Sequence, residues 1–160
     1  MYSNHLAQIM VAILQRNGKC SPERLSMLVF ICDWVSLLRR QKRLTEVKWI
    51  KTSSAVSTPI IRETIESYPD HFVSSTVLYD GVSRDAIEAS PVFLNTPILA
   101  DPETIKVIDE VVRVTKKYDA YSFLGNVLGL FPVKTTDTGK VIDLNKTYQE
   151  YLKFKARGSR

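Results

Sequence analysis

The chain has 160 residues, the size of one ordinary domain, and its 44% hydrophobic and 24% charged residues exclude a disordered protein. Short apolar runs, only two cysteines and no recognisable secretory signal exclude a membrane protein and a secreted disulfide scaffold, so we expect one cytoplasmic domain spanning 1–160. The net charge of +5 is concentrated in residues 39–51 and 146–160, and such basic segments favour anionic partners.

Two helices and a short strand are predicted in the first third of the chain. Apolar residues recur at helical spacing over 4–15, and Asn17-Gly18 follows as a stop signal. Ser21-Pro22 is a helix cap followed by a favoured first position, and the helix that it begins is apolar on nearly every face over 25–38. A helix without a polar face is surrounded by other elements, so this helix is expected at the centre of the core. Residues 47–51 then predict a short strand.

A third helix and a β-hairpin are predicted in the middle of the chain. Thr58-Pro59 begins the helix and Pro69 ends it. Residues 72–79 alternate with the period of a strand, and the following Asp80-Gly81 is a strong signal for a two-residue hairpin turn. The return strand is expected over 82–89, with its first residue opposite the last residue of the first strand.

Further helices are predicted after residue 100. Asp101 precedes a proline and caps a fourth helix, Asp119 caps a fifth, and an amphipathic helix ends the chain. The order helix, helix, strand, helix and hairpin is that of a winged helix. We therefore predict a mainly α fold with a small β-hairpin, in which a winged-helix-like core at about 20–90 is followed by a helical part at about 101–155.

No pattern in the sequence points to catalysis or to a metal ion. His5 and His71 have no histidine, cysteine or carboxylate at a metal-ligand spacing. Cys32 lies within the apolar helix, where a buried thiol is more common than a nucleophile, and Cys20 precedes a helix cap, where mild reactivity is the alternative. The six glycines are scattered and form no phosphate-binding loop. We expect no enzyme activity, no cofactor and no metal.

Two segments were considered for contact with DNA. The third helix suits the major groove poorly, because Arg62 is its one cation and faces competition from Glu63 and Glu66. The basic run before it is the better candidate for non-specific contact with the DNA backbone, although a solvated helix end also explains it. The candidate nucleic-acid-binding residues are Arg39, Arg40, Lys42, Arg43, Lys48 and Lys51.

Aromatic side chains indicate protein binding, because tryptophan and tyrosine bury a large area at interfaces at little entropic cost. Trp49 lies between lysines in the short predicted strand, where core packing and partner anchoring explain it equally well. Four tyrosines lie near the C-terminal helices. The candidate partner-binding residues are Trp49, Tyr118, Tyr121, Tyr148 and Tyr151.

Parts of the sequence resemble known families. The run LSMLVFICDW at 25–34, the basic segment after it, Trp49-Ile50-Lys51 and the segment VSTPII at 56–61 resemble the Panacea domain of SocA-like antitoxins. Residues 52–55 replace the Gly-Pro turn of that family. Residues 131–133, with 142–144 and the tyrosines that follow, are similar to the small middle component of three-component ABC-type defence operons, the Lamassu-like systems.

Both resemblances imply a small non-catalytic bacterial protein that binds a partner and keeps the activity of that partner conditional. The Lamassu-like resemblance implies a subunit in antiviral defence that bridges an SMC-like ATPase and an effector nuclease, with its basic residues near DNA. The Panacea-like resemblance implies an antitoxin that sequesters a toxin encoded beside it. A winged-helix DNA-binding regulator is a further alternative.

Overall fold

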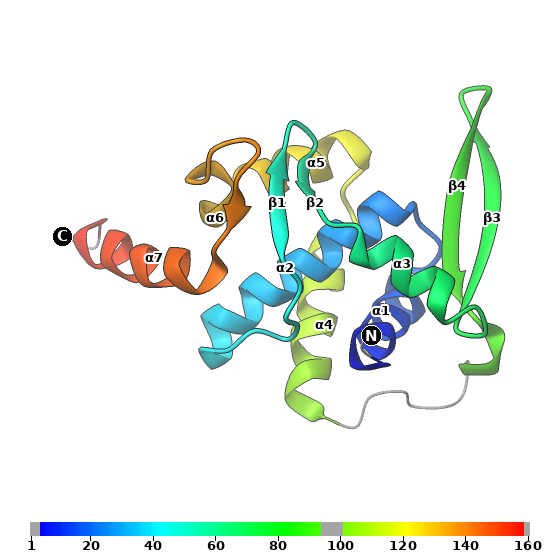
Figure 1. Cartoon of the computed structure of the whole chain (residues 1–160), viewed down its shortest axis with the longest axis horizontal. Helices are drawn as coiled ribbons and strands as arrows, with labels where there is room; N and C mark the ends of the chain where they lie inside the picture. Colours follow the sequence, from blue (N-terminus) through cyan, green and yellow to red (C-terminus); the bar gives the residue numbers. More distant parts are fainter. Residues whose placement is uncertain (1–3, 94–100, 159–160) are drawn as a thin grey trace.

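Seven α-helices and two small antiparallel sheets make up the part of the chain that the computed structural model describes, residues 4–93 and 101–158 (Figure 1). In chain order the elements are α1 (Asn4–Asn17), α2 (Pro22–Arg40), β1 (Trp49–Thr52), β2 (Ala55–Ser57), α3 (Ile60–Ser67), β3 (Phe72–Tyr79), β4 (Val82–Ala89), the 3-10 helix η1 (Pro91–Phe93), α4 (Pro102–Thr115), α5 (Ala120–Leu128), α6 (Phe131–Lys134), β5 (Val141–Ile142) and α7 (Leu144–Gly158). The prediction of a mainly α fold with a small β-hairpin is confirmed. Among these helices, none has the length and apolar content needed to cross a bilayer.

α2 is the central helix of the core, as its apolar sequence predicts. The Ser21 hydroxyl accepts a hydrogen bond from the backbone N–H of Arg24 at 3.1 Å, so the helix begins at the predicted cap. α1 and α4 both pack along α2, and side chains such as Leu28 and Phe30 are fully buried. The same cluster of buried side chains includes Ile108 of α4, so the C-terminal helices share their core with the N-terminal ones.

β3 and β4 form the predicted hairpin in the predicted register. Tyr79 pairs with Val82, and every residue of each strand has a partner on the other. Asp80 and Gly81 have φ angles of 51° and 77°, the left-handed backbone that a two-residue type I′ turn requires. β4 packs against α1, and β3 lies outside β4, so the hairpin stands at one end of the molecule (Figure 1).

The remaining strands form a second sheet that is separate from the hairpin. β1 pairs with β2 on one side and with β5 on the other. A turn at Ser53-Ser54, followed by Ala55 at a φ angle of 85°, folds β2 back onto β1 before α3 begins. The strand expected at 47–51 therefore pairs within this sheet and not with the hairpin, and a winged-helix core is not confirmed.

The C-terminal helices begin at the predicted caps. Asp101 Oδ1 accepts a hydrogen bond from the backbone N–H of Glu103 at 3.3 Å, and Asp119 Oδ1 accepts one from Ser122 at 2.8 Å. The short elements α6 and β5 were not predicted. α7 packs against α2 and α6, and its C-terminal part extends away from the rest of the molecule (Figure 1).

The two aspartate caps predict a loss of stability in acid. A hydrogen bond from the Thr104 hydroxyl lowers the pKa of Asp101, and one from the Ser122 backbone N–H lowers the pKa of Asp119. Because each folded-state pKa lies below the unfolded value of about 4, the stabilisation is complete above that pH and is lost as the pH falls through the folded pKa. We expect the double variant D101N/D119N to show a flatter pH dependence than the wild type, because asparagine caps a helix without a charge.

This expectation is checked by urea midpoints measured across the acid range, from about pH 6 to pH 3, where aspartates titrate. Asp70 is an exposed carboxylate in a turn and caps no described helix, so D70N is the matched control and should keep the slope of the wild type. Equal slopes for the double variant and the wild type would show that the caps do not set the acid sensitivity.

Candidate functional site

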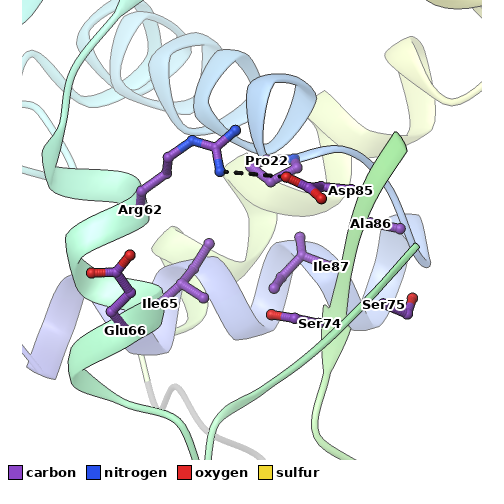
Figure 2. Close-up of a pocket in the computed structure, with 9 residues that line it drawn as sticks. All are labelled: Pro22, Arg62, Ile65, Glu66, Ser74, Ser75, Asp85, Ala86 and Ile87. Atoms are coloured by element: carbon purple, nitrogen blue, oxygen red, sulfur yellow. Dashed lines mark ion pairs between the residues drawn. The ribbon is translucent and has the colours of Figure 1, made fainter. Parts of the chain in front are cut away.

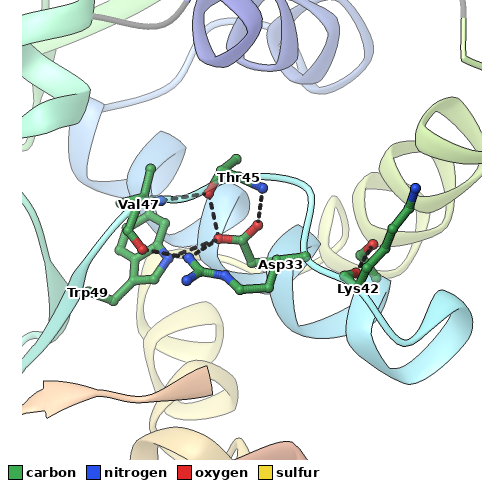
Figure 3. Close-up of polar contacts among 7 residues, drawn as sticks. Asp33, Lys42, Thr45, Val47 and Trp49 are labelled. Atoms are coloured by element: carbon green, nitrogen blue, oxygen red, sulfur yellow. Dashed lines mark hydrogen bonds and ion pairs between the residues drawn. The ribbon is translucent and has the colours of Figure 1, made fainter. Parts of the chain in front are cut away.

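A buried carboxylate, Asp33, organises the segment that follows α2 (Figure 3). Its side chain is fully buried and accepts four hydrogen bonds. Oδ1 accepts the backbone N–H of Thr45 at 2.8 Å, and Oδ2 accepts the Thr45 hydroxyl at 2.6 Å. Oδ2 also accepts Arg43 Nη2 at 2.8 Å and the indole Nε1 of Trp49 at 3.1 Å. These donors and the guanidinium replace the water that a buried carboxylate loses.

This network closes the loop 41–48 onto α2. The Ser36 hydroxyl donates to the backbone carbonyl of Lys42 at 2.6 Å, and Arg43 also donates to the carbonyl of Val47 (Figure 3). Trp49 follows the closed loop and lies in the core, where its ring makes an edge-to-face contact with the ring of Phe30, with 5.4 Å between the centroids. Asp33 was missed as a key residue, although an isolated carboxylate within an apolar helix was a visible signal.

Two of the candidate partner-binding residues lie in the buried core, and their role as partner anchors stays a prediction. Trp49 is 0% exposed and Tyr148 is 7% exposed. The Tyr148 ring packs edge-to-face against Trp34 at 6.4 Å. Both side chains belong to the hydrophobic core and expose little surface to a partner while the fold is intact.

The other three tyrosines do not form one surface. Tyr151 is half-buried in α7, with its ring 5.5 Å from that of Trp34 and 5.3 Å from that of Phe131. Tyr118 is half-buried in the segment between α4 and α5. Tyr121, in the first turn of α5, is 88% exposed. Only Tyr118 and Tyr121 lie near each other along the chain, and they remain candidates for a shared contact.

An apolar groove lies beside Tyr118, and we refer to it as the α2–α4 groove. It is lined by Ile31, Val35, Glu110, Val111, Val114, Thr115, Tyr118, Asn126 and Leu130. Its volume of about 220 Å³ is below the range of roughly 300–1,000 Å³ that is typical of small-molecule pockets, so it suits one or two side chains of another protein. The sequence did not predict this groove, because apolar residues that line a groove and those that fill a core recur at the same helical spacing.

Half of the six predicted DNA-binding residues are engaged in ion pairs within the chain. Arg39 forms an ion pair with Glu110, and the hydrogen bond from Arg39 lowers the pKa of that carboxyl. Arg40 lies 3.6 Å from Asp101, and Arg43 is bound to Asp33 as described. Among the described residues, no ion pair was found for the other three members of the segment, and these are Lys42, Lys48 and Lys51. The DNA-backbone hypothesis stays a prediction, and these three lysines are its members without an ion pair among the described residues.

A second hollow lies between α3 and the hairpin (Figure 2). Ile65 and Ile87 face each other across it, and Arg62 extends over it from α3. Arg62 is bound to Glu23 at 2.6 Å and lies 3.8 Å from Asp85. The single arginine at this surface is therefore already paired with carboxylates, and such a surface repels phosphate. This geometry agrees with the weak sequence case for DNA binding through the third helix.

The two thiols are protonated, and the described residues form no metal site. Burial raises the pKa of Cys20 to about 11 and also raises the pKa of Cys32, so both thiols are protonated at neutral pH. Within residues 4–93 and 101–158, no three side chains of histidine, cysteine, aspartate or glutamate lie together so that they could hold a metal ion. The predictions of no enzyme activity and no cofactor stay predictions.

Comparisons with protein-family models, with curated proteins and with solved structures found no match. The Panacea-like and Lamassu-like resemblances therefore rest on the sequence segments quoted above. The function is argued from the surface of the molecule, with the α2–α4 groove as the candidate site.

Proposed function

We propose that this chain is a non-catalytic interaction subunit that docks, through the α2–α4 groove, onto a toxic effector or onto the machine that controls it. The observation that carries the proposal is the apolar α2–α4 groove, which Tyr118 helps to line. Tyr121, three residues later in the chain, is 88% exposed. Pockets that take a single side chain and exposed aromatic side chains are both common features of protein interfaces.

Charged groups at the edge of the groove support the same proposal. Glu110 contributes to the lining of the groove, and its partner Arg39 is 60% exposed in its side chain. Interfaces commonly combine an apolar centre with a polar, solvent-accessible rim. The Arg39–Glu110 pair supplies such a rim, and it would orient a partner that places an apolar side chain between Val35 and Val114.

The identity of the partner is proposed from the sequence resemblances. In the Lamassu-like case the chain bridges an SMC-like ATPase and an effector nuclease in bacterial antiviral defence. In the Panacea-like case it is an antitoxin that neutralises a cognate toxin. Both roles place the chain in the cytoplasm, and both need a docking surface but no reactive centre. A winged-helix DNA-binding regulator is less favoured, because Arg62 is paired with Glu23 and Asp85.

Val114→Asp is expected to weaken association with the partner by about tenfold or more, because it places a charge in the apolar lining of the groove. Val114 is 41% exposed, so the carboxylate can stay hydrated in the free protein and the fold should be retained. The measurement is co-purification of the tagged chain with the products of the adjacent genes, followed by titration calorimetry of the complex. Val92→Asp introduces the same charge at a 71% exposed position of η1 and is the matched control.

A wild-type chain that co-purifies with none of these products would contradict the proposed function, and equal affinities for V114D and V92D would place the interface elsewhere. The two proposed partners are distinguished by expressing each neighbouring gene alone. A toxin is toxic by itself and is neutralised by this chain in a binary complex, whereas a bridging subunit is needed to recover a ternary assembly.

A further inference from the structure

The outer edge of β3 is an open strand edge at one end of the molecule (Figure 1). On the other side of the hairpin, the backbone of β4 at Ile87 is bonded to the backbone of Cys20. The Ile87 N–H donates to the Cys20 carbonyl at 2.7 Å, and the Ile87 carbonyl accepts from the Cys20 N–H at 3.0 Å. Ser74 of β3 lies opposite Ile87 of β4. Because the N–H and C=O of Ile87 point away from β3, the two residues form a pair without mutual hydrogen bonds, and the N–H and C=O of Ser74 point away from β4. Every second residue of β3, including Thr76, does the same, and among the described residues no strand pairs with that edge.

This edge lacks the devices that normally protect a strand from pairing. Natural edge strands carry lysines, prolines or bulges, or they are short. β3 has the sequence FVSSTVLY, with no charge, proline or glycine, and its ladder with β4 is regular along all eight residues. Apolar side chains are also exposed along it, with Leu78 at 78%, Val77 at 39% and Val73 at 36%. An unprotected edge of this length is a template for another strand.

The sequence of β3 is complementary to itself in one antiparallel register. With a two-fold axis at Ser75, Val73 lies opposite Val77 of the partner subunit, and Phe72 lies opposite Leu78 of the partner subunit. Both apolar pairs then occur twice, and the outward-directed N–H and C=O groups make about eight backbone hydrogen bonds. No like charges meet within the strand pair, because β3 contains none.

Ser75 itself is a second observation at this axis. Its hydroxyl is buried and has no hydrogen-bond partner among the described residues. In the two-fold register the Ser75 side chains of both copies lie opposite each other on the same face of the sheet, at the short spacing of a pair that exchanges no backbone hydrogen bonds. A rotation about χ1 would turn each hydroxyl, which its own chain covers in the single copy, toward the other as a partner.

We propose that two copies of this chain associate through their β3 edges and form a four-stranded antiparallel sheet in the order β4-β3-β3-β4. A second copy fits this edge better than an unrelated strand, because β3 offers no charge by which a foreign strand could be selected, whereas its own apolar pattern matches itself. The pairing is independent of the α2–α4 groove, which lies between other elements.

Sedimentation equilibrium of the full chain tests this proposal. The wild type is expected to reach twice the chain mass of 18.2 kDa as concentration rises. Thr76→Lys should raise the dissociation constant by about tenfold or more, because it places two like charges beside the axis. Thr138→Lys, in an exposed turn, makes the same substitution elsewhere and should dimerise like the wild type. Circular dichroism verifies that both variants remain folded.

Cysteine cross-linking tests the register. Ser75→Cys lies on the proposed axis and should form a disulfide between copies on mild oxidation, since opposed residues of this pair type have suitable Cα spacing. Val73 faces Val77 of the partner subunit, so in the Val73→Cys variant the two introduced cysteines lie far apart and should not form a disulfide between subunits. The proposal is overturned if the wild type is monomeric, or if T76K leaves the dimer intact. If the chain is a monomer and its β3 edge binds a product of an adjacent gene, the edge belongs to a foreign strand.

Discussion

Asp33→Ala is expected to lower the free energy of unfolding by about 3–5 kcal/mol, the cost of removing one partner from a buried ion pair. The substitution leaves the guanidinium of Arg43, with a side chain only 19% exposed, without its carboxylate. It also leaves the Thr45 backbone N–H and the indole N–H of Trp49 without their acceptor. A typical domain has a stability of about 5–15 kcal/mol, so this loss is a large share of the total.

Equilibrium denaturation in urea is the measurement, and two variants calibrate it. Asp33→Asn keeps the volume and an oxygen acceptor but not the charge. Its free energy of unfolding should therefore lie between those of the wild type and the alanine variant. Asp109→Ala removes an exposed carboxylate that pairs with Arg16, and its cost should stay within about 1 kcal/mol. If Asp33→Ala costs no more than Asp109→Ala, the network does not hold the loop 41–48 on α2.

A double-mutant cycle separates the ion pair from the rest of the network. Arg43→Met removes the charge and keeps most of the apolar stem of the side chain. If the pair itself is the main term, the double variant D33A/R43M should be more stable than the sum of the two single losses predicts, because no buried charge is left unpaired. Additive losses would instead assign the stability to the contacts of Asp33 with Thr45 and Trp49.

Local signals in the sequence predicted much of the fold. The hairpin register followed from Asp80-Gly81, because a two-residue type I′ turn fixes which residues face each other. Ser21, Asp101 and Asp119 were identified as caps, because each side chain bonds to a backbone N–H within three residues of itself. In each case the residues that decide the structure are neighbours along the chain.

Pairings between distant segments could not be predicted in this way. β5 lies about ninety residues after β1 in the chain and pairs with it. This pairing places β1 in a sheet that is separate from the hairpin. Arg39 and Arg40 are paired with Glu110 of α4 and with Asp101, the residue that caps α4, and no local pattern in the sequence connects these groups. The run of cations suggested either a surface for DNA or a solvated helix end, whereas the fold uses half of the run to attach α2 to α4 and to close a loop.

The candidate site shows the same limit. Val35 and Val114 recur at the spacing of core residues, and periodicity alone does not distinguish a groove from a filled interior. Trp49 shows the same limit, because its lysine neighbours left core packing and partner anchoring equally possible. Its burial depends on Asp33, which lies sixteen residues earlier and accepts the indole N–H.

Trp49→Ala should therefore act on stability and not on binding. The indole is 0% exposed and packs against Phe30 at 5.4 Å, so its removal leaves a large cavity and should cost about 3–5 kcal/mol. Trp49→Phe keeps an aromatic ring in the cavity but loses the hydrogen bond to Asp33, which retains three other donors. Its cost should be smaller, about 1–3 kcal/mol. Denaturation followed by circular dichroism measures both, since the substitutions alter the tryptophan fluorescence.

Binding of the folded variants then separates a core residue from an anchor. Trp49→Phe, assayed at a temperature where it is fully folded, should bind the partner with the affinity of the wild type, because no part of the indole reaches the surface. Tyr121→Ala should behave in the opposite way, since its 88% exposed ring contributes little to stability and is available to a partner. A Trp49→Phe variant with wild-type stability and weakened binding would return Trp49 to the interface and would require the loop 41–48 to open when the partner docks.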